Sequence, residues 1–322
     1  MPKESDFELV VGTIPAVAEG QVLVRTLFLS VDPYMRGRMT GVRTYADPVD
    51  IGQVMIGGTV GEVVESKNPN FHRGDVVAGF WGWREYAISD GAGLQKLDTS
   101  IAPPSTALGV LGMPGMTAYF GFLDICQPKP GETVVVSGAA GAVGSLVGQI
   151  AKIKGCRAVG IAGTDEKVAW ITKELGFDAG FNYKTTENYF EKLKELCPNG
   201  VDCYFDNVGG PVTDAVLPLL NVYARISICG QISQYNVAKP EPGVRPYVYL
   251  LTKQARAEGF IVTQFAERYA QGRAQMAQWI KEGKLKYREH FVDGFENTPR
   301  ALIGVLQGDN AGKMIVRVGQ PS

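Results

Sequence analysis

Short apolar segments rich in Val, Leu, Ile and Thr alternate with turn residues through the first hundred residues. They read QVLVRTLFLSV at 21–31, GGTVGEVVES at 57–66 and GDVVAGF at 74–80. Strands of this length, bounded by Gly, Pro, Asn and Asp, are typical of a barrel-like all-β module. We therefore predict a mostly β domain for the first third of the chain.

The pattern changes near Leu108. A small-residue, helix-leaning connector, TALGVLGMPGMTAYFGFLDIC at 106–126, leads into strand-like segments that alternate with helical ones. The predicted strands are Thr133–Ser137, Arg157–Ala162, Gly180–Tyr183, Val201–Asn207, Arg225–Gly230 and Gly259–Val262, and the predicted helices begin near Gly141, Asp165, Asn188, Val212 and Arg268. Such alternation predicts a parallel sheet covered by helices on both faces. From about Leu285 the chain turns strand-like again, and we expect it to return to the first domain.

Three glycines spaced three apart stand between a predicted strand and a predicted helix. The segment SGAAGAVGS, residues 137–145, follows the apolar run TVVV and opens AVGSLVGQIAKIKG. GxxGxxG departs from the commoner GxGxxG, but a strand–turn–helix–strand setting lets backbone N–H groups at a helix N-terminus bind a pyrophosphate. The alternative is a turn that serves only close helix–strand packing. We favour a dinucleotide-binding turn.

The end of the second strand indicates which dinucleotide is bound. An NAD site usually places an acid there for the ribose 2′-hydroxyl, whereas this strand ends in Gly163 and Thr164. Lys167 lies on the following helical turn, where it can reach a 2′-phosphate. Asp165 and Glu166 could also reach back, although acids are common at helix starts, and Thr164 is a suitable N-cap. We predict NADP(H).

Composition and charge narrow the class of protein. The chain has 322 residues, more than one core usually holds, so two domains are expected. With 32 basic and 33 acidic residues and no long basic cluster, neither nucleic acid nor an anionic membrane is an expected partner. The start does not resemble a signal peptide, and no apolar run approaches membrane-spanning length. Five scattered cysteines without a CxxC pair favour a reducing compartment such as the cytoplasm.

Six segments spread over nearly the whole chain carry a resemblance to a known family. They are LFLSVDPYMRGRM (27–39), GMPGMTAYFG (112–121), VVVSGAAGAVGS (134–145), VDCYFDNVGG (201–210), ICGQISQYN (228–236) and GDNAGKMIV (308–316). Together they resemble the medium-chain dehydrogenase/reductase superfamily, in its zinc-independent leukotriene dehydrogenase/prostaglandin reductase branch with its bacterial curcumin reductases. The resemblance implies an α/β fold: a doubly wound Rossmann domain at 109–285, and a GroES-like, mostly β catalytic domain at 1–108 and 286–322. It also implies a homodimer formed through the cofactor domains.

No metal site is predicted. The chain has two histidines, His72 and His290, each far in sequence from any cysteine cluster, and we interpret both as surface residues. A catalytic zinc needs about three protein ligands and a structural zinc about four, which argues against a zinc alcohol dehydrogenase. Without a metal ion an isolated carbonyl lacks its usual charge stabiliser, whereas hydrogen bonds can stabilise the enolate formed from a conjugated enone. The resemblance implies that reaction: NADPH-dependent reduction of the carbon–carbon double bond in α,β-unsaturated ketones and aldehydes.

The resemblance also implies a set of cofactor-binding residues. The phosphate turn maps to Gly141, Ala142, Val143, Gly144 and Ser145, and the 2′-phosphate partners to Lys167 and Tyr183. The adenine, ribose and nicotinamide contacts map to Asn207, Cys229, Gly230, Gln231, Ile232, Ser233, Tyr235, Phe260, Ile261, Val262 and Asn310. For Cys229 the alternative is a small packing residue at a strand end.

Protonation of the enolate needs a donor, and a tyrosine, neutral at pH 7, is a natural one. Tyr45, in VRTYADP, matches a substrate-facing tyrosine of some relatives, and Tyr235, in ISQYN, is the second option. A further tyrosine of the animal enzymes corresponds to Thr252 here. The alternatives are that Tyr45 is a simple loop aromatic and that solvent supplies the proton.

The expected substrate is a small hydrophobic enone or enal. Trp81, Trp83 and Tyr86, in GFWGWREYA at 79–87, could line an apolar pocket, and the alternative for at least one tryptophan is core packing. The proline-rich segment 236–249 is expected to be an exposed loop. Two other functions stay open: an NADPH quinone oxidoreductase of the same superfamily, and a cofactor-binding protein without turnover.

Overall fold

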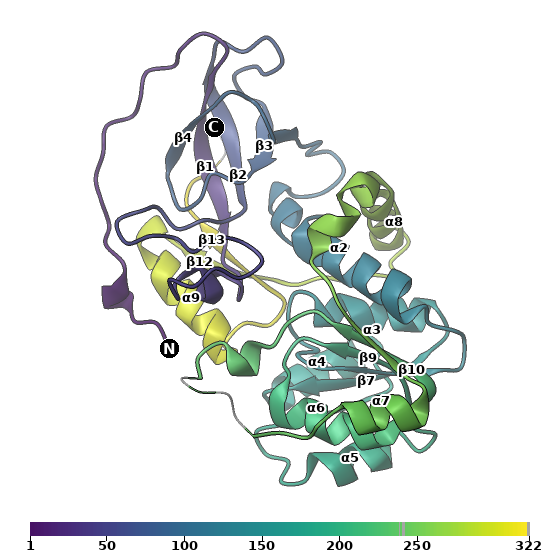
Figure 1. Cartoon of the computed structure of the whole chain (residues 1–322). Helices are drawn as coiled ribbons and strands as arrows, with labels where there is room; N and C mark the ends of the chain where they lie inside the picture. Colours follow the sequence, from purple (N-terminus) through teal and green to yellow (C-terminus); the bar gives the residue numbers. More distant parts are fainter. Residues whose placement is uncertain (238, 240–241, 321–322) are drawn as a thin grey trace. The chain divides into compact units, whose positions relative to one another are not determined.

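The computed structural model describes residues 1–237, 239 and 242–320. The chain divides into two compact units, one of residues 1–109 with 289–322 and one of residues 110–288 (Figure 1). We describe each unit by itself, the β-rich unit first and the α/β unit second.

The β-rich unit is built on one mixed sheet in the order β12-β13-β1-β2-β3-β5, with β4 also paired to β1. Its strands are β1 (Val22–Ser30), β2 (Thr59–Ser66), β3 (Val76–Gly79), β4 (Tyr86–Ser89), β5 (Gln95–Lys96), β12 (Glu289–Asp293) and β13 (Lys313–Arg317). The C-terminal strand β13 runs antiparallel to β1, with Phe28 opposite Arg317. The tail of the chain therefore completes the sheet formed by the first hundred residues.

Two helices of this unit were not predicted, α1 (Met35–Arg38) and α9 (Thr298–Gln307). The strand-like segment KMIVRV is confirmed as β13, while α9 is a helix of the tail that the pattern did not predict. Proline in the first turn of α9 and a left-handed Gly308 (φ 76°) after its end are the usual start and stop signals of a helix. Its buried side chains pack with those of β1 and β13 in one apolar cluster.

Both tryptophans that we considered as pocket walls are packing residues of the β-rich unit. Trp83 is 9% exposed and stacks on Phe7 with ring centroids 5.3 Å apart. The indole Nε1 of Trp81 donates to the Thr26 hydroxyl at 2.8 Å. Trp83 is therefore a core residue of one apolar cluster, and Trp81 is partly buried against another.

The α/β unit contains six parallel strands in the order β11-β10-β9-β6-β7-β8. They are β6 (Thr133–Val136), β7 (Arg157–Ala162), β8 (Ala179–Asn182), β9 (Val201–Asp206), β10 (Leu220–Ile228) and β11 (Arg256–Gly259). The strand order reverses between β6 and β9, which is the arrangement of a doubly wound Rossmann sheet. The predicted parallel α/β fold is confirmed.

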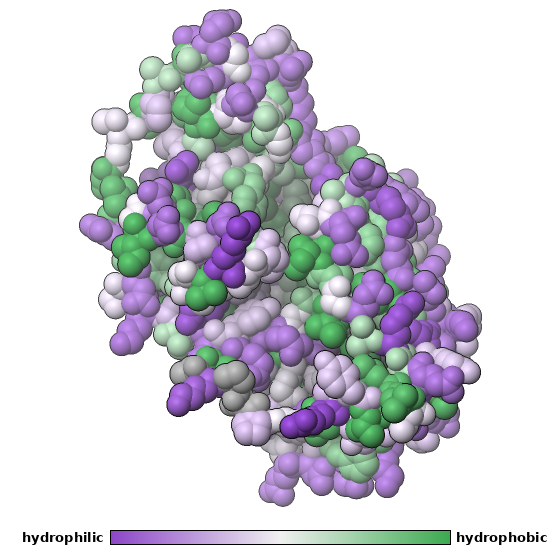
Figure 2. Space-filling model, in the orientation of Figure 1, coloured by the Kyte–Doolittle hydropathy of each residue, from purple (hydrophilic) through white to green (hydrophobic). Residues whose placement is uncertain are grey.

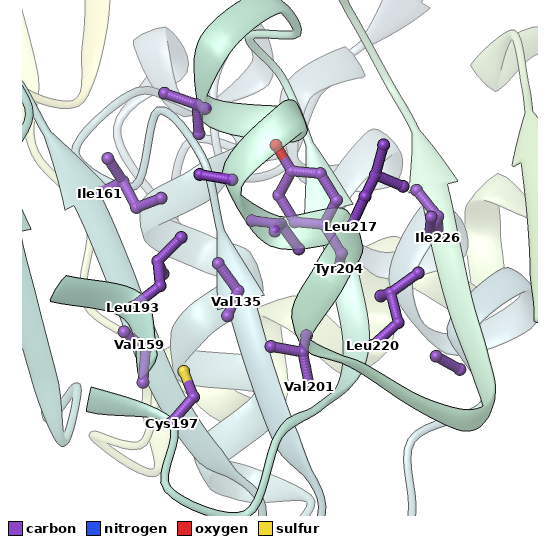
Figure 3. Packing of buried hydrophobic residues seen from close by; sticks show 14 of the residues in the cluster. Val135, Val159, Ile161, Leu193, Cys197, Val201, Tyr204, Leu217, Leu220 and Ile226 are labelled. Carbon is purple, nitrogen blue, oxygen red and sulfur yellow. The ribbon is translucent and has the colours of Figure 1, made fainter. Parts of the chain in front are cut away.

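Helices cover both faces of this sheet (Figure 1). They are α2 (Met113–Phe120), α3 (Gly144–Ile153), α4 (Asp165–Lys173), α5 (Tyr189–Leu196), α6 (Gly210–Val216), α7 (Tyr247–Lys253) and α8 (Tyr269–Lys281). On one face, side chains of the strands point toward α5 and α6 and form the cluster drawn in Figure 3, with Tyr204 fully buried at its centre. On the other face, Gly160 of β7 leaves room for Ile171 of α4, because a Cβ there would lie 2.4 Å from that side chain.

Two predicted segments of the α/β unit need correction. The strand expected at Gly259–Val262 ends at Gly259, and a 3-10 helix follows from Val262 to Arg268. The loop expected at 236–249 ends earlier, because α7 begins at Tyr247; residues 238, 240 and 241 of that loop lie outside the described residues. Near the start of the unit, the helix-leaning connector is confirmed as α2, which continues as a π-helical turn over Gly121–Cys126.

Candidate functional site

Each glycine of the turn after β6 has a structural reason, either its backbone conformation or a close neighbour. Gly138 has a left-handed φ of 61°, which glycine adopts without strain. A Cβ on Gly144 would lie 2.4 Å from the Gly138 carbonyl oxygen, and one on Gly141 would lie 3.2 Å from the same oxygen. The turn therefore folds onto itself through bare backbone, and α3 begins at Gly144, three residues later than predicted.

The N-terminus of α3 lies at the carboxyl end of β6, where the strand order reverses. Val143 precedes the helix without a side-chain cap. The first N–H groups of a helix lack intrahelical acceptors, and the aligned peptide dipoles favour an anion beside them. An uncapped ten-residue helix behind a turn of bare backbone is suited to a pyrophosphate, so the site fits a dinucleotide.

Asn207 is attached to this turn. Its backbone N–H donates to the Ser137 hydroxyl at 2.9 Å, and its side-chain Nδ2 donates to the Ser137 carbonyl at 2.7 Å. A Cβ on Gly138 would lie 3.4 Å from the Asn207 Cβ. The structure thus brings this predicted cofactor residue next to the glycine turn.

The predicted run from Cys229 to Tyr235 folds against the end of β9. The backbone N–H groups of Cys229 and Gly230 donate to the Asp206 carbonyl at 2.9 and 3.1 Å, and that of Ile232 donates to the Asn207 carbonyl at 3.3 Å. The Tyr235 hydroxyl accepts from the Gln231 N–H at 3.3 Å. Burial, together with the nearby Asp206 carboxylate, raises the pKa of the Cys229 thiol to about 12, so this thiol stays neutral at ordinary pH.

Asp206 is a residue of this site that the sequence did not reveal. The residue is 1% exposed. It accepts hydrogen bonds at 2.8–3.0 Å from the side chains of Ser137, Tyr204, Thr213 and Gln231 and from the backbone N–H groups of Val208 and Gly209. These donors come from the ends of β6 and β9, from α6 and from the turn after β10. Asp206 therefore fixes the turns that carry the predicted cofactor residues.

The predicted 2′-phosphate partners follow β7 and β8: Lys167 is in the first turn of α4, and Tyr183 comes directly after β8. The Tyr183 ring lies against Gly163, where a Cβ would be 3.1 Å from the ring, and burial raises the pKa of its phenol. The predicted cap is confirmed, since the Thr164 hydroxyl accepts from the Lys167 N–H at 3.2 Å. Asp165, the first acid after the end of β7, accepts a hydrogen bond from Asn182 Nδ2 at 2.9 Å and is therefore already bonded to β8.

The remaining predicted residues lie in both units, Phe260 and Ile261 in the α/β unit and the others in the β-rich unit. Phe260 is 7% exposed, and its ring lies so close to Gly121 that a Cβ there would be 2.3 Å from it, whereas Ile261 is 41% exposed. Tyr45 and Asn310 belong to the β-rich unit. Tyr45 is 59% exposed, and the Asn310 side chain donates to the Gly312 carbonyl at 2.7 Å.

Within residues 1–237, 239 and 242–320, no group of three or more His, Cys, Asp or Glu side chains is arranged to hold a metal ion. His72 and His290 are both exposed, as predicted. None of the helices described for this chain combines the length and apolar character needed to cross a membrane.

Two family models match the chain. One, described as the N-terminal domain of oxidoreductase, covers residues 1–97, and the other, described as zinc-binding dehydrogenase, covers residues 142–281. The two matches fall in the β-rich unit and in the α/β unit, respectively.

Relatives are similar over almost the whole chain. The NADPH-dependent curcumin reductase of Escherichia coli is 50% identical over 98% of this chain and 93% of its own length. Prostaglandin reductase 1 of Rattus norvegicus is 50% identical over 98% of this chain and 95% of its own. The crystal structure of CurA from Vibrio vulnificus in complex with NADPH is 49% identical, covers 99% of this chain and 96% of its own, and superposes with a TM-score of 0.95.

Proposed function

This chain belongs to the zinc-independent branch of the medium-chain dehydrogenase/reductase family, and from that premise we propose that it reduces the carbon–carbon double bond of α,β-unsaturated ketones and aldehydes with NADPH. One observation at the site carries the choice of cofactor. The end of β7 presents glycine under a tyrosine ring, with Lys167 on the next turn and Asp165 already bonded to Asn182. This arrangement suits the extra phosphate of NADPH better than the bare 2′-hydroxyl of NADH.

The residues of the α/β unit are proposed to bind the dinucleotide. The N-terminus of α3 would hold the pyrophosphate, and Lys167 with the Tyr183 hydroxyl would bind the 2′-phosphate. Asn207 and the turn from Cys229 to Tyr235 would line the ribose and nicotinamide side, held in place by Asp206. When bound, NADPH supplies the hydride that adds to the β-carbon of the substrate.

The protein must then supply one proton to the substrate. Addition at the β-carbon moves negative charge to the carbonyl oxygen, and the resulting enolate takes a proton at its α-carbon. We assign that proton to the phenol Oη of Tyr45, whose side chain is 59% exposed. Tyr235 is the second candidate, and its hydroxyl accepts from the Gln231 N–H of its own turn.

We further propose that the α/β unit is the cofactor domain and the β-rich unit the GroES-like catalytic domain, and that two chains associate through the α/β unit. β11 ends its sheet among the described residues, and α7 beside it exposes Tyr247, Val248 and Leu251. Unpaired strand edges and apolar helix faces of this kind favour association.

All five cysteines are free, which suits a reducing compartment such as the cytoplasm.

The function is tested by measuring NADPH consumption with a panel of enals, cyclic enones, oxo-prostaglandins, curcumin and quinones. We expect turnover with conjugated enones or enals, and deuterium from labelled NADPH at the β-carbon of the saturated product. Faster consumption with quinones would instead indicate a quinone oxidoreductase. NADPH that binds but is never consumed would indicate a protein without turnover.

A further inference from the structure

Arg38, the last residue of α1, is a buried cation without an acidic partner. It is 4% exposed, and no carboxylate among the described residues forms an ion pair with it. Its Nε atom is buried and has no hydrogen-bond partner there. Arginine is rarely buried unless it is paired, so such a placement suggests a role that requires the guanidinium.

Arg38 lies over the ring of Tyr34, just before α1, at 6.0 Å from its centroid, and its closer contacts are with the following loop, residues 39–49. Its guanidinium carbon lies 4.4 Å from the centroid of the Tyr45 ring, within the range of a cation–π contact. Its Nη1 donates to the Thr44 hydroxyl at a long 3.5 Å, and its backbone carbonyl accepts from the Val49 N–H at 2.8 Å. One arginine therefore attaches this loop to α1 at three points.

The ends of this loop are held separately, since Met39 and Val49 pack against the apolar cluster of the β-rich unit and the Thr40 hydroxyl donates to the Gly37 carbonyl at 2.8 Å, whereas its middle has fewer contacts. Residues 41–45 are all exposed, and in this stretch Arg43 forms an exposed ion pair with Asp47 at 3.1 Å. Exposed ion pairs of this kind contribute little to stability. The cation–π contact with Arg38 is therefore the contact from which we argue the position of the Tyr45 ring. This contact is made through the ring face and does not use the phenol oxygen.

We propose that Arg38 is a positioning residue that holds Tyr45 ready to donate its proton to the α-carbon of the enolate. The inference rests on the proposed function and assigns Arg38 a role in it. The O–H bond of Tyr45 breaks, a C–H bond forms on the substrate, and water returns a proton to the phenolate. The planar guanidinium suits this task because it stacks on an aromatic face, which the ammonium of lysine does less well.

The test compares kcat for the wild-type enzyme, Tyr45→Phe, Arg38→Met and the double variant, with a conjugated enone as substrate. Arg43→Met is the matched control, since it removes the same charge from an exposed side chain of the same loop. We expect Arg38→Met to lower kcat by about 10- to 100-fold, the usual effect of a misplaced catalytic group, with NADPH affinity unchanged. The double variant should be no slower than Tyr45→Phe, and Arg43→Met should match the wild type.

Several outcomes would overturn the inference. They are a double variant in which the two losses multiply, an Arg43→Met enzyme as slow as Arg38→Met, and an Arg38→Met enzyme with the wild-type rate. Full activity of Tyr45→Phe would also overturn it, yet would leave enone reduction standing, because wild-type turnover is measured first. If thermal melting shows that Arg38→Met does not fold, Arg38→Lys decides: it should lower kcat in the wild-type background and not in the Tyr45→Phe background.

Discussion

The carboxyl end of β7 is where single side chains decide between NADPH and NADH. Lys167→Ala should weaken NADPH binding roughly 10- to 100-fold, because a charge-assisted hydrogen bond to the 2′-phosphate is lost. NADH lacks that phosphate, so its affinity should not change. Titration of each dinucleotide against the protein by fluorescence measures both values.

Lys173→Ala provides the control, because Lys173 is an exposed lysine in the last turn of the same helix. It should leave both affinities as they are. Equal NADPH affinity in Lys167→Ala and wild type would refute the assignment of Lys167 to the 2′-phosphate.

The sequence could reveal residues that act through local context, and could not reveal those that act through distant partners. The glycine turn and the Thr164 cap follow from neighbours within a few positions. Asp206 depends on Ser137, which lies 69 residues earlier, and on Gln231, which lies 25 residues later. Its role appears only when the sheet brings these donors together.

At the scale of elements, an ion pair joins β10 to the segment before β6. Arg225 bonds both carboxylate oxygens of Glu132, at 3.0 and 2.6 Å, and also the carbonyls of Cys126 and Gln127. Burial by itself would raise the pKa of Glu132, but the hydrogen bonds from Arg225 and from the Lys129 backbone outweigh it and hold the pKa below its ordinary 4.5. The folded state therefore prefers the carboxylate.

Glu132→Gln should consequently destabilise the protein at neutral pH by roughly 1.5 kcal/mol or more, the contribution of a hydrogen bond to a charged group. The pair contributes fully above the ordinary pKa of Glu132, and its contribution is lost as the pH falls through the lowered value. Thermal melting from about pH 7 down to pH 3 should show the difference between wild type and variant shrinking. A difference that stays constant across this range would contradict the assignment.

Elements with a strong local pattern were predicted well. β7 has the predicted bounds, and α4 begins at the predicted residue. β10 begins five residues before its predicted start. Leu220–Ala224 include exposed positions, and in this stretch only Leu220 pairs with β9 before the regular pairing begins at Arg225. Helix α9 carries local signals, a proline in its first turn and Gly308 after its end, that a strand-like interpretation of the tail leaves out.

At the scale of the whole molecule, the exposed hydrophobic side chains of α7 support the proposed association of two chains. Figure 2 shows hydrophobic residues gathered over α7, and Leu251 of that helix is 78% exposed. Leu251→Asp should weaken the dimer roughly 10- to 100-fold, the effect of losing a buried anchor. Sedimentation velocity over a range of concentrations measures this.

Leu9→Asp is a suitable control, since Leu9 is 63% exposed and lies in the β-rich unit. It should sediment like the wild type. A wild-type protein that is monomeric at all concentrations, or a Leu251→Asp protein that remains dimeric, would reject the proposed interface.

The six donors around Asp206 have a consequence for anion recognition. A formal negative charge lies directly beneath a turn that we propose receives phosphates, and an exposed anion there would repel them. Six hydrogen-bond donors surround that carboxylate, and their dipoles reduce the negative potential that it produces at the turn. Asp206→Asn would therefore not improve the affinity for phosphate. It would leave some of the six donors without an acceptor, and these donors hold the turns that we propose bind the cofactor.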